Sequence, residues 1–302
     1  MRISLVISTY NRGLQLVRTL NSVAVQTLPA ADWELVVVDN NSTDGTGDLF
    51  AGFAAAHPRL NTRIVRETKQ GLSYARNRGI AESKAPVIVM IDDDEEINPG
   101  FLGAYDSFFE SHPAAVAAGG KMVACYEDKR PKWMSHYTEA LATSTIDMGN
   151  RMIPFRRGRY PIGGNMAFRR QVFDWYGTFN TELGRKGDVL IGGEEKDMFG
   201  RIASGGRETW YVPGAVADHI IPPSRVTKAR FCKQARMAGV SERIRTRSIS
   251  GWAYFKALAA EGAKWVATLC IYLWFLLCQK PLKAHYLVMM RRSISAGLLK
   301  GK

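Results

Sequence analysis

The sequence predicts an α/β fold, a mostly parallel sheet flanked by helices, followed by a basic, amphipathic helical C-terminal extension. Up to about residue 123, short runs rich in β-branched residues alternate with segments whose apolar residues recur at helical spacing. The charges divide the chain: residues 1–224 hold 25 Lys and Arg against 26 acids, whereas residues 225–302 hold 16 against two. A near-neutral body with a tail of net charge +14 indicates a polyanionic partner for the tail.

Each strand of the predicted sheet is a short apolar run. Nearly continuous Val and Ile are typical of strands that are covered on both faces. Helical patterns separate the runs, and Asn98 and Pro99 fit the cap and first residue of the last of these helices. The alternation of strands and helices predicts parallel strands with right-handed crossovers. The expected strands are 3–9, 33–39, 62–67, 86–92 and 114–123, and the expected helices are 14–26, 47–57, 72–83 and 101–112.

Polar clusters follow three of these strands, at Thr9–Arg12, Asp39–Ser42 and Asp92–Asp94. Parallel sheets bind ligands beyond the carboxyl ends of their strands, so we expect the three clusters along one edge, lining a binding crevice. Asp92 and Asp94 can offer carboxylate oxygens to Mg²⁺ or Mn²⁺. The alternative is a solvated acidic loop before a helix start.

Length and cysteine content set further bounds. A chain of 302 residues can bury a substantial core, in one large domain or one domain with an appendage. The four cysteines show no metal-binding spacing, which predicts reduced, buried thiols. The apolar run from Ile3 to Ser8 is too short for the hydrophobic core of a signal peptide, so we expect it to belong to the fold.

Six motifs occur in a recognisable order over about residues 3–224. They are VISTYNR, VVVDNNSTDGT, GLSYARNRGIA, VMIDDDEEINP, PIGGNMAFRR and GGEEKDMFGRI. In this order they resemble the family 2 glycosyltransferases, whose GT-A fold has a Rossmann-like sheet. The resemblance implies an inverting transferase that takes a nucleotide-diphosphate sugar and uses Mn²⁺ or Mg²⁺.

The resemblance also implies roles for residues of the first four motifs. Asp39 would accept a hydrogen bond from the base, and Asp94 would be the direct metal ligand, with Asp92 and His219 completing the metal set. His219 could equally contact a phosphate or be structural. Arg76 would face the nucleotide or its phosphates, the alternative being an exposed helix charge. The full nucleotide set is Thr9, Tyr10, Asn11, Arg12, Asp39, Asn41, Arg76, Asp92 and Asp93.

The motif GGEEKDMFGRI matches the family segment that supplies the catalytic base. Its second acidic position is Glu195, where the family more commonly has Asp. A sugar hydroxyl must lose its proton as it attacks, and a single displacement with one base gives inversion. A nearby helix start would favour the ionised form of Glu195. Glu194 stays open as the base, and both acids could simply reflect the charge bias of a helix start.

The acceptor side is predicted from the second half of the chain. Glycines at 163 and 164 would let a ligand approach the backbone closely, and Asn165 would bind sugar hydroxyls. Trp133 would stack on a sugar ring or belong to the core. The predicted sugar and acceptor set is Gly164, Asn165, Glu194 and Trp133. We expect a nucleotide-binding half at 1–123, an acceptor and catalytic half at 124–224, and the extension at 225–302.

The extension contains a predicted helix that stops near Pro281. Its charge-free run from Trp265 to Cys278 is shorter than the ~20 residues that span a bilayer. Lys256, Glu261 and Lys264 lie within one arc of the helix, leaving a broad aromatic and aliphatic face. Such a helix suits the headgroup region of an anionic membrane. A core helix or an oligomer contact, for example in a homodimer, is the alternative.

Together these features predict a membrane-peripheral enzyme on the cytoplasmic face. It would move sugar from a nucleotide-diphosphate sugar to a lipid-linked saccharide in surface polysaccharide or glycan biosynthesis. The alternative is a soluble transferase that acts on protein or free glycan and uses the tail as an oligomer contact. We do not expect nucleic-acid binding, because the basic tail lacks recognisable nucleic-acid modules.

Overall fold

The computed structural model describes residues 1–156, 158–187 and 189–301, and the chain forms two compact units. The sheet unit consists of Met1–Ala124, Thr145–Glu182 and Glu194–Ile220. The helical unit consists of Cys125–Ser144, Leu183–Gly193 and Ile221–Lys302. It therefore draws on segments upstream of residue 225 in addition to the predicted extension, whose last residue, Lys302, lies outside the described residues.

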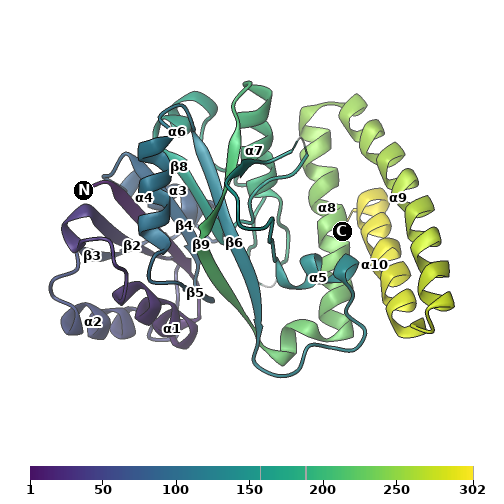
Figure 1. Cartoon of the computed structure of the whole chain (residues 1–302), viewed down its shortest axis with the longest axis horizontal. Coiled ribbons are helices and arrows are strands. Elements are labelled where there is room, and N and C mark those ends of the chain that lie inside the picture. Colours follow the sequence, from purple (N-terminus) through teal and green to yellow (C-terminus); the bar gives the residue numbers. More distant parts are fainter. Residues whose placement is uncertain (157, 188, 302) are drawn as a thin grey trace. The chain divides into compact units, whose positions relative to one another are not determined.

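Nine strands form one sheet within the described residues, in the order β3-β2-β1-β4-β8-β6-β9-β5, with β7 paired to β9 (Figure 1). The strands β3, β2, β1 and β4 are parallel, and β8 continues the sheet antiparallel to β4. This confirms the predicted fold class, a mostly parallel sheet flanked by helices. The strands are β1 (Ile3–Thr9), β2 (Trp33–Asp39), β3 (Thr62–Arg66), β4 (Val87–Asp92), β5 (Glu95–Ile97), β6 (Ala117–Tyr126), β7 (Ile153–Pro154), β8 (Asn165–Arg169) and β9 (Thr209–Ile221).

Helices cover both faces of the sheet. Leu16, Phe50 and Tyr105 of α1, α2 and α4 pack on one face in one buried cluster. The helices α3, α6 and α7 pack on the other face, where Phe199 stacks on Phe168. Burial on both faces explains the continuous apolar strands. These helices are α1 (Gly13–Ala24), α2 (Thr46–Ala56), α3 (Leu72–Glu82), α4 (Phe101–Ser111), α6 (Gln171–Tyr176) and α7 (Glu194–Ser204), with a 3-10 turn η1 at Ala30–Asp32.

Strands β5 and β8 and the start of helix α4 are among the elements that differ from the sequence prediction. The run NMAFR forms β8, inserted between β4 and β6, although it follows two glycines and is too short to show a period of its own. The short strand β5 forms inside the acidic run because β9 pairs with it. Helix α4 begins at Phe101 after Gly100, so Asn98 and Pro99 are not its cap and first residue. Their carbonyls instead accept hydrogen bonds from Gln26 and Thr27.

The helical unit packs three long helices and one short helix around an apolar cluster (Figure 1). The helices are α5 (His136–Thr143), α8 (Lys228–Ile249), α9 (Gly251–Leu277) and α10 (Pro281–Lys300), with a 3-10 turn η2 at Pro223–Val226. The predicted helix stop near Pro281 is confirmed, since α10 begins there. By length and composition alone, α9 is long and apolar enough to cross a membrane, unlike its charge-free run taken alone.

The surroundings of Trp133 match one of its two predicted alternatives, whereas two of the cysteines differ from expectation. Trp133 is buried in the helical unit, stacked on Tyr286 with 4.4 Å between ring centroids and packed against Phe231. It is therefore the core residue of the two alternatives, not a sugar-stacking surface. Cys125 and Cys270 are exposed, so the expectation of buried thiols is wrong for them.

Candidate active site

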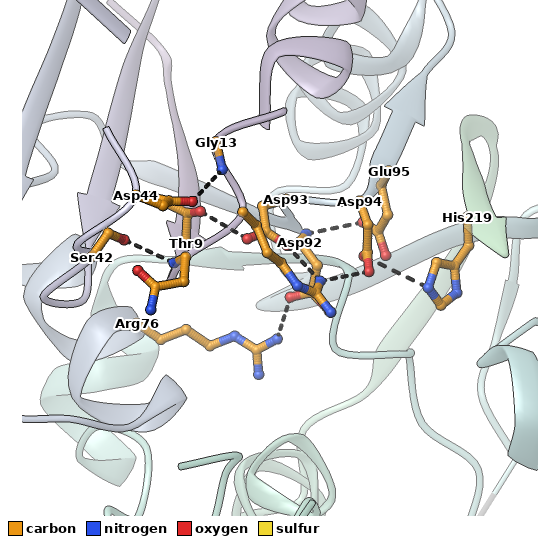
Figure 2. A network of polar contacts seen from close by, with 12 residues as sticks. Thr9, Gly13, Ser42, Asp44, Arg76, Asp92, Asp93, Asp94, Glu95 and His219 are labelled. Carbon is orange, nitrogen blue, oxygen red and sulfur yellow. Dashed lines mark hydrogen bonds and ion pairs between the residues drawn. The ribbon is translucent and has the colours of Figure 1, made fainter. Parts of the chain in front are cut away.

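Three polar segments meet at the carboxyl edge of the parallel strands (Figure 2). At the end of β1, the Thr9 hydroxyl donates to Asp93 Oδ2 at 2.8 Å. The Asn11 backbone N–H donates to Ser42 Oγ at 2.9 Å, which joins the segments that follow β1 and β2. The predicted convergence of the three clusters on one edge is therefore confirmed.

Asp93 is the buried centre of this edge. Besides the Thr9 hydroxyl, its carboxylate accepts a hydrogen bond from Arg12 Nη1 at 2.9 Å. Arg12 Nη1 also lies 2.7 Å from Asp94 Oδ2. Burial, opposed by the Arg12 guanidinium, raises the pKa of Asp93 to about 6. Arg12 and Asp93, both predicted to bind nucleotide, thus form an ion pair that links the ends of β1 and β4.

Three other acids gather beside this pair. Asp92, Asp94 and Glu95 each bring one carboxylate oxygen within 4.8 Å of the others. Glu95 is buried, and its Oε2 accepts the Asp92 backbone N–H at 3.0 Å. Burial and the charges of Asp92 and Asp94 raise the pKa of Glu95 well above its usual range. The sequence prediction does not include Glu95 in the metal set. The acidic run DDDEE, which contains it, is the signal that points to it.

His219 completes the cluster from the neighbouring strand. It lies inside β9, not after it, and is in register with Glu95 of β5. Its Nε2 is 3.6 Å from Asp94 Oδ1 (Figure 2). Carboxylate oxygens and an imidazole nitrogen suit Mn²⁺, and the oxygens suit Mg²⁺. Asp92, Asp94, Glu95 and His219 are thus the residues that could hold a divalent cation.

Arg76 is a buried connector rather than a surface cation. It is 2% exposed, and its Nη2 donates to Asp92 Oδ1 at 2.9 Å and to the Gly163 carbonyl at 3.0 Å. Its Nη1 donates to Glu194 Oε1 at 2.7 Å. The alternative of an exposed helix charge is therefore wrong, and the predicted contact with the nucleotide or its phosphates stays a prediction. These three hydrogen bonds join α3 to the end of β4, to the loop before β8 and to the start of α7, which are distant from one another in sequence.

The glycines before β8 admit protein side chains rather than a ligand. A Cβ on Gly164 would lie 1.7 Å from Glu95 Oε1, so only glycine leaves room for that carboxylate. Asn165 is fully buried: its Oδ1 accepts the Tyr105 hydroxyl at 2.5 Å, and its Nδ2 donates to the carbonyls of Lys121 and Ala215. Asn165 is therefore a structural residue and not the predicted sugar contact.

The two acids at the start of α7 differ in their surroundings. Glu194 is buried against Arg76, whereas Glu195 is partly exposed. Its partial burial and the charge of Glu194 raise the pKa of Glu195 to about 8. The expected stabilisation of the ionised form by the helix start is therefore outweighed. A helix end acts as about half a charge, which does not offset both the loss of water around Glu195 and the whole charge of the adjacent carboxylate.

The remaining predicted nucleotide residues lie at the ends of β1 and β2. Tyr10 is 37% exposed. Asp39 Oδ1 accepts the Ser42 backbone N–H at 2.9 Å. Asn11 and Asn41 adopt left-handed backbone conformations, and Asn41 Oδ1 accepts a hydrogen bond from Arg66. The polar groups of this edge thus come from the ends of three strands that are neighbours in the sheet, β2, β1 and β4. A nucleotide site in a parallel sheet requires such an arrangement.

The family model for glycosyl transferase family 2 matches residues 4–177, more than half of the chain. The chain belongs to this family. Similar curated family proteins include a glucosyl-dolichyl phosphate glucuronosyltransferase of Haloferax volcanii, which is 28% identical over 207 residues, 67% of this chain and 63% of its own length. A dolichol-phosphate mannosyltransferase of Pyrococcus furiosus is 27% identical over 180 residues, 58% of this chain and 48% of its own length. The matches thus span less than two thirds of these relatives.

Solved structures share the fold of this family 2 chain. The mannosyltransferase PcManGT of Pyrobaculum calidifontis, solved with GDP-Man and Mn²⁺, has a TM-score of 0.65 and 20% sequence identity, covering 100% of this chain and 88% of its own. Staphylococcus aureus TarS 1–349 has a TM-score of 0.56 and 17% identity, covering 100% of this chain and 95% of its own. At these identities the likeness concerns the fold.

Proposed function

We propose that this family 2 transferase is an inverting, metal-dependent enzyme that moves a sugar from a nucleotide-diphosphate sugar to a lipid-linked saccharide. Family membership supports a nucleotide-sugar donor. The names of the Haloferax and Pyrococcus relatives, both dolichyl or dolichol phosphate transferases, support a lipid-linked acceptor. The observation that carries the proposal is the set of three carboxylates whose oxygens lie within 4.8 Å at the strand edge.

The carboxylate cluster fits a divalent cation by its chemistry. The half-buried Asp92 and the buried Asp94 and Glu95 concentrate negative charge at one place. Burial, together with the charges of Asp92 and Asp94, raises the pKa of Glu95 well above its usual range, and a bound cation would offset both effects. Asp94 and Asp92, with His219 beside Asp94, would hold the ion. Bound Mn²⁺ or Mg²⁺ supplies charge stabilisation for the departing diphosphate. The PcManGT structure, solved with GDP-Man and Mn²⁺, supports this choice of ion and donor class.

Glu195 is the proposed general base. Of the two acids at the start of α7, Glu194 is committed to its ion pair with Arg76 at 2.7 Å. Glu195 is partly exposed and has a pKa of about 8, so its carboxylate form, which can take up the proton of an attacking hydroxyl, gains population as the pH rises through about 8. Attack from the face opposite the diphosphate gives inversion in a single displacement.

The proposed site of membrane attachment is the outer face of α9. Large apolar side chains along this helix are exposed, among them Trp252, Phe255, Val266, Leu269, Leu273, Trp274 and Leu277. Lys256 and Lys264 lie on the same helix and are also exposed. In a coiled coil, polar residues would flank the apolar stripe, but Ala263, Cys270 and Leu277 occupy flanking positions here. Anionic lipid is therefore the favoured occupant, at the cytoplasmic face.

A donor screen tests the catalytic part of the proposal. Purified protein is incubated with a panel of nucleotide sugars and a lipid-linked saccharide, with Mn²⁺ or with EDTA. We expect one donor to be consumed, with release of the nucleoside diphosphate only when metal is present. Absence of binding and turnover for every donor, with Asp94→Ala matching the wild type, would refute it.

Vesicle flotation tests the membrane part. We expect the protein to float with vesicles that contain phosphatidylglycerol. With neutral vesicles at moderate salt, it should not bind and should stay at the bottom of the gradient. The double variant Lys256→Glu/Lys264→Glu should bind the anionic vesicles roughly tenfold or more weakly, because each lysine contributes about 1 kcal/mol near such a surface. Lack of flotation together with dimers in sedimentation would favour the soluble enzyme with an oligomer contact instead.

A further inference from the structure

We infer that Arg76 and Glu194 form a buried positioning pair that holds the base Glu195 in place relative to Asp92 of the carboxylate cluster. The inference rests on the proposed function, because it assigns Glu195 as the base. It gives Arg76 a task different from a phosphate contact, and Glu194 a task different from an acceptor contact or a base.

The geometry of Arg76 carries the inference. Its acceptors are Asp92, the Gly163 carbonyl and Glu194, which are 16, 87 and 118 residues away in sequence. They belong to the end of β4, the loop before β8 and the first residue of α7. A guanidinium presents its donors in one rigid plane, so three acceptors bound to it are fixed relative to one another. An ammonium group cannot impose this geometry.

Glu194 depends on Arg76 for its charge balance. It is buried, and its second carboxylate oxygen, Oε2, has no hydrogen-bond partner among the described residues. Arg76 Nη1, at 2.7 Å, is therefore its principal counter-charge. Because Glu194 and Glu195 are adjacent at the start of α7, a fixed Glu194 also fixes the backbone that carries Glu195.

Protein groups enclose Arg76 on at least two sides. The guanidinium carbon lies 5.8 Å from the centre of the Phe179 ring. On another side, a Cβ on Gly163 would lie 3.0 Å from Nη2, so the backbone of the loop lies close to the group. A guanidinium that is enclosed in this way and bonded to two carboxylates is well placed to orient them.

Arg76→Lys tests the pair, with Arg78→Lys as the matched control on the same helix. Arg78 is 44% exposed at its side chain and pairs with Glu82, one helical turn away. We expect Arg76→Lys to lower kcat by roughly 100-fold, the effect of a misplaced catalytic group, with the donor KM within about threefold. Arg78→Lys should match the wild type. A tenfold rise in donor KM at unchanged kcat would instead make Arg76 a phosphate contact and overturn the inference.

Glu194→Gln is a second test of the Arg76–Glu194 pair. It replaces the first test if a thermal melt shows that Arg76→Lys does not fold. The charged groups that act on Glu195 are Glu194 and Arg76. Removal of the Glu194 charge should therefore lower the acidic limb of the kcat/KM profile by about one pH unit, together with a fall in kcat. An unchanged profile and kcat would refute the pair. Wild-type turnover in the same assay tests the proposed function separately, since its absence would refute that function and not the pair.

Discussion

The sheet unit and the helical unit both bury carboxylates, but they balance the charge in different ways. In the sheet unit, Asp92, Asp94 and Glu95 lie together, and their repulsion helps to raise the pKa of Glu95. In the helical unit, Glu261 of α9 is 6% exposed and accepts hydrogen bonds from Arg291 at 3.0 Å and from the Ser295 hydroxyl at 2.8 Å.

This difference separates a binding site from a structural ion pair. A buried acid that has its own cation and hydroxyl can maintain a fold without any ligand. Several buried acids that share too little positive charge store unfavourable energy, which a bound cation relieves. Arg12 and Arg76 balance part of the charge of the acids at the sheet edge, and under the proposed function a bound cation balances more of it.

The largest expected effect is on the carboxylate cluster. Asp94→Asn should lower kcat/KM by roughly 10³-fold, because a metal ligand in this site supports several kcal/mol of charge stabilisation. The binding of Mn²⁺, followed by calorimetry, should weaken in parallel. Asp218→Asn is the matched control, since Asp218 is an exposed carboxylate on β9 next to His219. Equal Mn²⁺ affinity in the two variants would contradict the distinction between a cation site in the sheet unit and a structural ion pair in the helical unit.

The next effect concerns the pH dependence of the base. Because the pKa of Glu195 is raised to about 8, the carboxylate form gains population as the pH rises. In the free enzyme, kcat/KM should therefore increase with pH through about 8 and level off above it. Glu195→Gln should remove this limb and lower activity by about 10²- to 10⁴-fold. A variant that retained the limb would show that another group is the base.

A smaller effect, on stability alone, is expected in the helical unit. Glu261→Leu should lower the free energy of unfolding by up to about 3 kcal/mol, because the half-buried Arg291, 13% exposed at its side chain, would lose its partner. The double variant Glu261→Leu/Arg291→Leu should recover most of this loss. Urea unfolding measures both. Equal losses in the single and double variants would mean that packing, and not the charge balance, explains the effect.

The smallest effect is expected at the last acid of the run DDDEE. Glu96 pairs with Arg18 at 2.9 Å, and both side chains are substantially exposed. Glu96→Gln should change stability by less than about 0.5 kcal/mol, since exposed ion pairs contribute little, and should leave turnover unchanged. A large loss of activity would show that burial does not distinguish the acids of this run that are needed for activity from those that are not.

The parts of the fold that the sequence predicts well are those whose burial is continuous along the chain. The bounds of β1 and β2 equal the predicted ones because each is a mostly apolar run between polar turns, in which the buried polar side chains Ser4 and Glu34 pair with each other. β5 and β8 are short and depend on partner strands that lie far away in sequence. No local pattern can reveal such pairing.

The same limit applies to the site. The convergence of three strand ends was predictable, since parallel strands must end at one edge. The partners of Arg76 were not predictable, because Glu194 is 118 residues away. Asn165 and Trp133 were given ligand-binding roles because amides and indoles serve equally well in cores and in sugar sites. Only their neighbours, Tyr105 in one case and Tyr286 in the other, distinguish these roles.

The bonds of Arg76 have a consequence for engineering. The guanidinium of Arg76, in residues 1–123, donates to a backbone carbonyl and a carboxylate that residues 124–224 contribute. The two halves are therefore not interchangeable modules. A chimera that joins the second half of a relative to this first half would need a matching acid and loop, because otherwise Arg76 would keep Asp92 but lose its other two acceptors.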